Sequence, residues 1–384
     1  MSAPLLTLGD LGARFARRPE SVLDLADDIA TRFAALGDAH VPAPLGAAAR
    51  NLLARCPDPS ALPLWGVPYV VGANIDVAGL PTSAGLSALD FLPDFDAVLV
   101  ERLRAAGALL VGKVPADPLD LDAPAFGSSE AVAAGLAAFA IASDRADIAG
   151  HGVVEVRPTP GLISLDGLFG IAPELDDVAI HAVDVAGGAA VRTIIGWSGP
   201  TGLRAPKRFA RLGLLGGDKS SMVRDIGERL GLKTVAVDAA LFAEAAALME
   251  DDIWLAQRLD DVATAFVERP DLFPPRCRRR LSLALDCPAR QLVQAQRCLS
   301  ALRRQIDAAF SDIDLLFVPP AFGSATFTSA CGLTAVVLPD GGALVGAGGD
   351  DDRLAAAAAT LIVPNPSRST RPIDIQASSP LAHR

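Results

Sequence analysis

The chain has 384 residues, of which 51% are hydrophobic and 21% charged, and its formal net charge is −11. This length can bury a sizeable core, and the acidic balance argues against nucleic-acid binding, which needs clustered Lys and Arg. The apolar runs at 131–142 and 354–363 are shorter than the about 20 residues of a spanning helix. The start of the chain has no basic segment and no hydrophobic signal core. We therefore expect a cytoplasmic protein that binds neither membrane nor nucleic acid.

In the first third of the chain, the spacing of apolar residues predicts a helix and then alternating strands and helices. Apolar residues recur at steps of three and four between 22 and 36, which is typical of a helix. The short apolar run 68–75 lies between turn residues and predicts a strand. Asp96 is expected to cap a helix that ends at Gly107, before a buried strand at 108–111. This rhythm predicts an α/β sheet with covering helices.

The pattern becomes helical between about 215 and 310. One helix is predicted from Leu241 to Trp254 and another from Leu292 to Phe310, because apolar residues recur there with a helical period. Residues 364–384 are polar and rich in Ser, Pro and Arg, which is typical of a flexible tail. We expect a single domain over 1–363, with the helical region as an insertion, followed by the tail.

Nothing in the residue spacing predicts a metal or cofactor site. The cysteines have no CxxC pairing and the histidines are scattered, so neither set resembles a metal site. Gly346–Gly349 lacks the Lys of a phosphate loop and predicts a turn. Asp350–Asp352 is interpreted as a helix start rather than a cation site. The basic cluster Arg276–Arg280 is interpreted as a solvated helix face rather than an anion patch.

Several motifs, in the same order, carry a resemblance to a known family. They are the segment 64–85, the helix–strand unit 96–113 with its Gly-Lys end, and the run 157–164, which begins Arg-Pro-Thr-Pro-Gly. On these motifs, from about residue 20 to 360, the chain resembles the amidase signature family, and most closely the amidase domain of allophanate hydrolase. The resemblance implies a mixed, twisted β-sheet flanked by helices, with a helical insertion, and makes a homodimer plausible.

The family's chemistry uses a nucleophilic serine, a second serine in a cis peptide and a lysine base. A serine hydroxyl is a weak nucleophile until an adjacent base takes its proton. In the resemblance, the lysine position is Gly72, and the nucleophile position falls near Ile148 in a shortened loop where Asp144 matches the family aspartate. No catalytic residue of the family is intact at these positions. The resemblance therefore implies a fold whose usual chemistry has been removed.

Two serines and a histidine offer an alternative site. Ser128 and Ser129 could be remnants of the relay serine, although we favour helix N-capping with Glu130 close behind. His151 could act as a replacement base, oriented by a nearby acid such as Glu155. The alternative hypothesis is thus an active amidohydrolase that cleaves C–N bonds with Ser128 or Ser129 and His151.

Arg258 is the candidate for ligand binding, with Asp144 beside the lost nucleophile. Arg258 matches an arginine that the resemblance associates with a substrate carboxylate, and a guanidinium suits a planar anion. Glu250 stands where the resemblance expects a tyrosine, and it would oppose such an anion. A structural ion pair at Arg258 is the other interpretation.

The leading hypothesis is a degenerate, inactive amidase-like protein. It would be a partner or regulator of an active amidase, would pair with itself, or would bind a small carboxylate or amide in amide or urea nitrogen metabolism. An open cleft that held a serine within reach of another lysine, such as Lys113, would overturn it.

Overall fold

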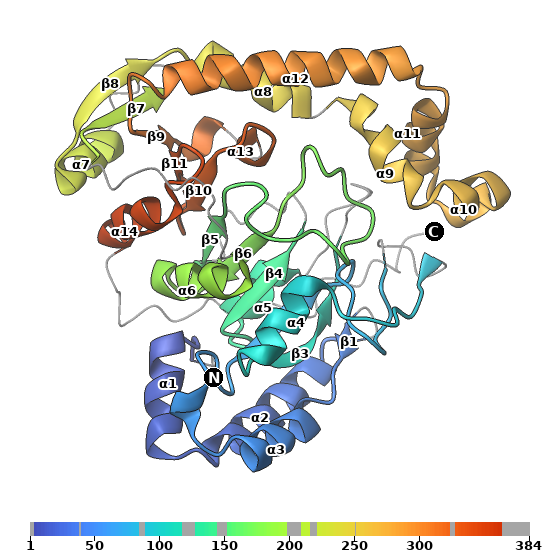
Figure 1. The fold of residues 1–384 in the computed structure, drawn as a ribbon, viewed down its shortest axis with the longest axis vertical. Helices are drawn as coiled ribbons and strands as arrows, with labels where there is room; N and C mark the ends of the chain where they lie inside the picture. Colours follow the sequence, from blue (N-terminus) through green and yellow to red (C-terminus); the bar gives the residue numbers. More distant parts are fainter. Residues whose placement is uncertain are drawn as a thin grey trace.

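The described residues form a mixed sheet of eleven strands, in the order β1-β3-β2-β4-β6-β5-β10-β11-β9-β7-β8 (Figure 1). The structure is a computed structural model. It describes residues 4–37, 40–83, 89–116, 127–143, 152–197, 209–215, 221–249, 251–322 and 327–362. The sheet and its flanking helices confirm the predicted α/β fold.

The strands are short and mostly buried on both faces, as their continuous apolar sequences require. Within the described residues they are β1 (Val41–Pro42), β2 (Pro68–Gly72), β3 (Leu109–Val114), β4 (Phe139–Ala142), β5 (Val154–Arg157), β6 (Ala179–Ala182), β7 (Arg211–Leu215), β8 (Lys233–Val237), β9 (Leu315–Val318), β10 (Thr334–Val337) and β11 (Ala343–Gly346). β2 runs parallel to both β3 and β4, and β7 runs parallel to β8 and β9. The other paired strands are antiparallel.

Helices cover both faces of the sheet. In the described residues they are α1 (Leu8–Arg17), α2 (Ser21–Ala34), α3 (Leu45–Arg55), α4 (Val98–Ala105), α5 (Ser128–Ala133), α6 (Val185–Ile195), α7 (Ser221–Leu230), α8 (Ala239–Met249), α9 (Leu255–Asp260), α10 (Ala263–Glu268), α11 (Pro275–Leu285), α12 (Ala289–Ala309), α13 (Phe327–Ala330) and α14 (Asp351–Leu361). Short 3-10 turns lie at Pro59–Ala61, Asp252–Trp254, Pro270–Leu272 and Pro320–Phe322.

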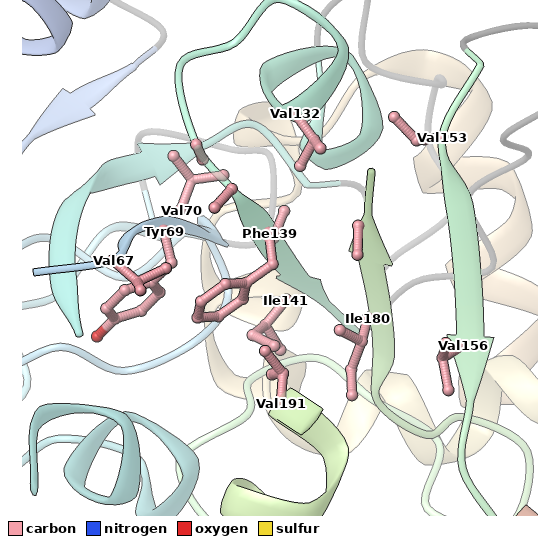
Figure 2. Close-up of a cluster of buried hydrophobic side chains, with 14 of the residues drawn as sticks. Val67, Tyr69, Val70, Val132, Phe139, Ile141, Val153, Val156, Ile180 and Val191 are labelled. Carbon is pink, nitrogen blue, oxygen red and sulfur yellow. The ribbon is translucent and has the colours of Figure 1, made fainter. Parts of the chain in front are cut away.

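Three apolar clusters hold these layers together. The largest joins the N-terminal helices, α6 and α14 to the sheet, and Figure 2 shows Val191 of α6 against Ile141 and Ile180 of neighbouring strands. Gly188 allows this close approach, because a Cβ there would lie 2.7 Å from Val156 Cγ2. A second cluster packs α8, α12 and α13 against β9, β10 and β11. A third lies among α9, α10 and α11.

Several predicted elements are confirmed. The N-terminal helix is α2, and the helix before Gly107 is α4, whose C-cap is Ala106. Gly107 has a φ of 88°, which only glycine adopts readily. The helix predicted from Leu292 to Phe310 is α12. Asp350 is the N-cap residue of α14, as expected for a helix start.

Two expectations were wrong. Asp96 does not cap α4; the N-cap is Ala97. The carboxylate of Asp96 instead accepts the Ala78 N–H at 2.8 Å and pairs with Arg104 at 2.6 Å, so it holds the preceding loop in place. The helix predicted from 241 to 254 is also divided. α8 ends at Met249, and Asp251 accepts the Ile253 N–H to begin a separate 3-10 turn.

Candidate functional site

The candidate site lies at the carboxyl ends of β2, β3 and β4. These strands are parallel neighbours and end at Gly72, Val114 and Ala142. Ligands of open α/β sheets bind outside such carboxyl ends. Polar residues that follow or flank these ends are buried here: Asn74, Thr82, Lys113 and Ser143.

Gly72, the last residue of β2, is buried and leaves little room for a side chain. A Cβ at this position would lie 3.1 Å from Asn74 Oδ1 and 3.4 Å from Ala116 Cβ. A larger residue would therefore press on Asn74. The position at which the family resemblance expects a lysine contributes only backbone to the site.

Among the described residues, Lys113 brings an amine to the strand beside Gly72, because it pairs with Val71 across β2 and β3. Its Nζ is 2.9 Å from Thr82 Oγ1, and Thr82 Oγ1 is 2.7 Å from Asp76 Oδ1. Lys113 and Thr82 are both fully buried. Burial lowers the pKa of Lys113 to about 8, against the opposing charges of Asp76 and Asp90. Burial likewise raises the pKa of Asp76, against the hydrogen bond from Thr82 and the charge of Lys113.

The hydrogen bonds of this cluster decide what it can do. A hydroxyl and an amine within bonding distance are the elements of a nucleophile and its base. The single proton of Thr82, however, is directed to the Asp76 carboxylate, so the Lys113 amine donates to the hydroxyl instead of accepting its proton. Among the described residues, Lys113 thus meets the threonine Thr82 in a buried setting. The cluster ties the segment after β2 to the neighbouring strand.

A second polar contact lies beside Gly72. Asn74 donates through Nδ2 to Ser143 Oγ at 2.5 Å and to the Phe169 carbonyl at 3.0 Å. Ser143 is the first residue after β4 and is buried. Sequence reasoning did not single out Asn74, Thr82, Asp76 or Ser143. The one available signal was that Asp76 directly follows the strand predicted at 68–75.

Ser128 and Ser129 form the first turn of α5 and are buried. The helix is capped by its neighbours: the Gly127 N–H donates to Glu130 Oε2 at 3.0 Å, and Ser129 Oγ lies 3.1 Å from the same oxygen. Glu130 thus performs the capping that the sequence suggested for the serines. Asp144, Ile148 and His151 lie outside the described residues. The Ser–His alternative therefore stays a prediction.

Glu155, a proposed orienter of His151, has other partners. Its Oε1 is 2.5 Å from Arg157 Nε, and its Oε2 is 3.8 Å from His181 Nε2. All three side chains are buried at the centre of the sheet, where Glu155 is paired with His181 across β5 and β6. Burial alone would raise the pKa of Glu155, but the Arg157 and His181 side chains outweigh it and hold the pKa below its usual value. Glu155 is thus a carboxylate already paired within the sheet.

Arg258 lies in α9 as half of a buried ion pair. Its Nη2 is 2.6 Å from Asp176 Oδ1, and both side chains are almost fully buried. Asp176 Oδ2 also accepts the Ala172 N–H at 2.7 Å. A guanidinium that already bonds a buried carboxylate has less capacity for a second anion. This geometry favours the structural interpretation of Arg258.

Asp177, next to this pair, provides a pH-dependent prediction. Burial raises the pKa of Asp177 to about 7, and the hydrogen bond from the Val178 N–H only partly opposes it. Since the folded pKa lies above the unfolded value of 3.8, the wild type should lose stability as pH rises through this window. In Asp177→Asn this pH-dependent loss of stability should disappear. At pH 8 the loss in the wild type should be about 1–2 kcal/mol, after allowance for the partial exposure of Asp177. Urea unfolding at a series of pH values measures it, and equal pH slopes in the two proteins would contradict it.

Part of this chain is similar to a known protein family. The model of the family described as Amidase matches residues 21–121. A glutamyl-tRNA(Gln) amidotransferase subunit from Deinococcus deserti is 33% identical over 258 residues, which is 59% of this chain and 51% of that protein. Residues 21–121 of this chain are thus similar to the Amidase family, and the relative matches over a longer stretch. This chain spans about half the length of that relative.

Solved structures agree with the amidase fold over nearly the whole chain. Allophanate hydrolase from Kluyveromyces lactis has a TM-score of 0.78 at 19% identity, and the match covers 95% of this chain and 74% of that one. A structure described as a vestigial protein complex that reveals the origins of an s-triazine catabolic enzyme has a TM-score of 0.74 at 23% identity, covering 93% and 98%. At these identities the likeness shows the fold alone.

Within that amidase fold, the described residues provide few amines for the family's chemistry. The lysines of the chain are Lys113, Lys207, Lys219 and Lys233. Lys233 is exposed on β8, and Lys207 and Lys219 fall outside the described residues. No described helix is both long and apolar enough to cross a membrane. The same residues contain no cluster of three or more His, Cys, Asp or Glu side chains that could hold a metal ion.

Proposed function

We propose that this protein is a catalytically silent amidase-fold protein that acts by binding, as a partner or regulator of an amide-hydrolysing enzyme. The observation that carries the proposal is Gly72 at the carboxyl end of β2, where the family resemblance expects the lysine base. A glycine cannot hold a proton, and the amine on the adjacent strand, Lys113, is buried against Thr82. Without a base, a hydroxyl in this site would be a poor nucleophile.

The comparisons support a role in association. The Deinococcus deserti relative is named as one component of an amidotransferase, and the s-triazine neighbour is described as a complex. The neighbours allophanate hydrolase and urea amidolyase make amide or urea nitrogen metabolism the natural setting of the proposal.

The test is a direct measurement of hydrolysis and of nucleophile reactivity. The purified chain is incubated with allophanate, malonamate and simple amides, and ammonia release is followed. A fluorophosphonate probe reports any activated serine. We expect no ammonia above the buffer control and no stoichiometric labelling. Gly72→Lys serves as a matched variant that restores the amine alone.

Sustained hydrolysis by the wild type, abolished by Ser128→Ala, Ser129→Ala or the removal of His151, would establish the active alternative and end the proposal. Small-ligand binding is tested separately by calorimetry with malonate. Specific binding raises apparent stability by mass action. Malonate binding by the wild type that is lost in Arg258→Met, while circular dichroism shows that Arg258→Met is still folded, would make the chain a carboxylate binder.

A further inference from the structure

Asn74 has a buried hydrogen-bond acceptor that no donor reaches. Its Oδ1 has no hydrogen-bond partner among the described residues, and the side chain is fully enclosed. The nitrogen and oxygen of this amide are assigned by the Phe169 carbonyl, which can only accept and lies 3.0 Å from Nδ2. A buried acceptor without a donor lowers stability, so most such atoms in proteins have a partner. Asn74 Oδ1 can therefore accept one further hydrogen bond.

Ser143 has the complementary group, a hydroxyl proton. Its Oγ accepts a hydrogen bond from Asn74 Nδ2 at 2.5 Å, so the two hydrogens of Nδ2 are directed to Ser143 and Phe169. A serine hydroxyl that accepts a bond still has its own proton to donate. Within the part of the chain that the structure describes, this proton has no acceptor. Asn74 and Ser143 thus place one acceptor and one donor beside each other.

Gly72 keeps the space beside Asn74 Oδ1 free of a side chain. It ends β2 next to β4, the strand that Ser143 follows. A Cβ at Gly72 would lie 3.1 Å from Asn74 Oδ1 and 3.4 Å from Ala116 Cβ, so both atoms border this space. A glycine lets another molecule approach the backbone closely. The space lies at the carboxyl ends of parallel strands, where ligands of such sheets bind, and its borders admit only a small group.

The chemistry of these groups selects a neutral ligand. Asn74 and Ser143 carry no charge, and the nearby Lys113 amine is bonded to Thr82. A carboxylate buried here would lack a counter-charge, which is costly. A primary amide has an N–H that suits Asn74 Oδ1 and a carbonyl oxygen that suits the Ser143 hydroxyl. A primary amide therefore satisfies both groups without adding charge.

We propose that Asn74 and Ser143, beside Gly72, bind the primary amide group of a small neutral ligand. Asn74 Oδ1 accepts an amide N–H, and Ser143 Oγ donates to the amide oxygen. This site is separate from Arg258, whose guanidinium is bonded to Asp176. The inference rests on the proposed function, because a silent site keeps its amide intact, and it names the ligand class that a binding role would use.

Three probes of the same shape test the ligand class. Propionamide, butanone and propionate differ only in the NH2, CH3 or O− group on the carbonyl carbon. Binding to the full chain is measured by saturation-transfer NMR titration. Propionamide should bind about fivefold or more tightly than butanone, which lacks the N–H, and than propionate, whose charge would be buried unpaired. Equal binding of the three probes would overturn the proposal, as would no saturable binding of propionamide.

Two substitutions locate the bound amide. Ser143→Ala removes the donor and should weaken propionamide binding about fivefold. Gly72→Ala places a methyl group against Asn74 Oδ1 and should weaken binding further. Ser282→Ala, exposed on α11, and Gly9→Ala, whose Cβ would meet no atom within 4 Å, are the matched controls and should bind as the wild type does. Wild-type affinity in both site variants, with circular dichroism showing them folded, would contradict the assignment.

The same probe separates this inference from the proposed function. If the wild type bound propionamide and released ammonia from it, the silent-site proposal would fail and the amide site would stand. If it neither bound propionamide nor released ammonia, the amide site would fail and the silent-site proposal would stand.

Discussion

Replacing Arg258 by methionine should lower the free energy of unfolding by about 3–5 kcal/mol, because it leaves a buried carboxylate without its counter-charge. Asp176 and Arg258 are almost fully buried and are joined at 2.6 Å. Methionine keeps much of the length of the side chain but removes the cation. Urea denaturation at neutral pH measures the loss.

A double variant tests whether the main role of Arg258 is the ion pair with Asp176 or the binding of a ligand. In Asp176→Asn with Arg258→Met, neither residue carries a charge, so most of the lost stability should return. The asparagine can still accept the Ala172 N–H that Asp176 accepts at 2.7 Å. If the double variant were no more stable than Arg258→Met alone, the ion pair would not be the main role of Arg258.

The elements that could be predicted from the sequence are those that the spacing of neighbouring residues defines. α2 and α12 have apolar residues at helical steps, and Gly107 has the positive φ that ends α4. These features depend on residues a few positions apart. The sequence pattern did not predict that the helix ends at Met249. The break arises because the Asp251 side chain accepts a hydrogen bond from the Ile253 N–H and begins a new turn.

The contacts of the site depend on distant residues and could not be read from spacing. Lys113 reaches a threonine 31 positions earlier, and Arg258 reaches an aspartate 82 positions earlier. The parallel pairing of β2 with β3 brings the ends of these strands together, and with them Lys113 and the segment after Gly72. The family resemblance indicated the sheet and the position of Gly72, but not which partner Lys113 would find.

Lys113→Met should stabilise the protein by about 2 kcal/mol at pH 7, even though it removes a hydrogen bond. The folded pKa of Lys113 is about 8, below the ordinary 10.5, because burial penalises the charged amine. The wild type therefore loses stability as pH falls from 10.5 through 8, and the cost persists below that range. This pKa shift corresponds to a destabilisation of about 3 kcal/mol, which Lys113→Met removes. The loss of the hydrogen bond to Thr82 costs about 1 kcal/mol, which leaves the net gain of about 2 kcal/mol.

The stability gain of Lys113→Met over the wild type should decrease above pH 10, since the amine of the wild type is then neutral in both the folded and the unfolded chain. Lys233→Met, on the exposed strand β8, should change stability little at any pH. Destabilisation by Lys113→Met at every pH would show that the hydrogen bonds of the amine outweigh the cost of burying it.

A buried amine that lowers stability is also a functional-site candidate, so the same variant enters the hydrolysis assay. If the wild type released ammonia and Lys113→Met did not, Lys113 would be a working base and the silent-site proposal would be wrong.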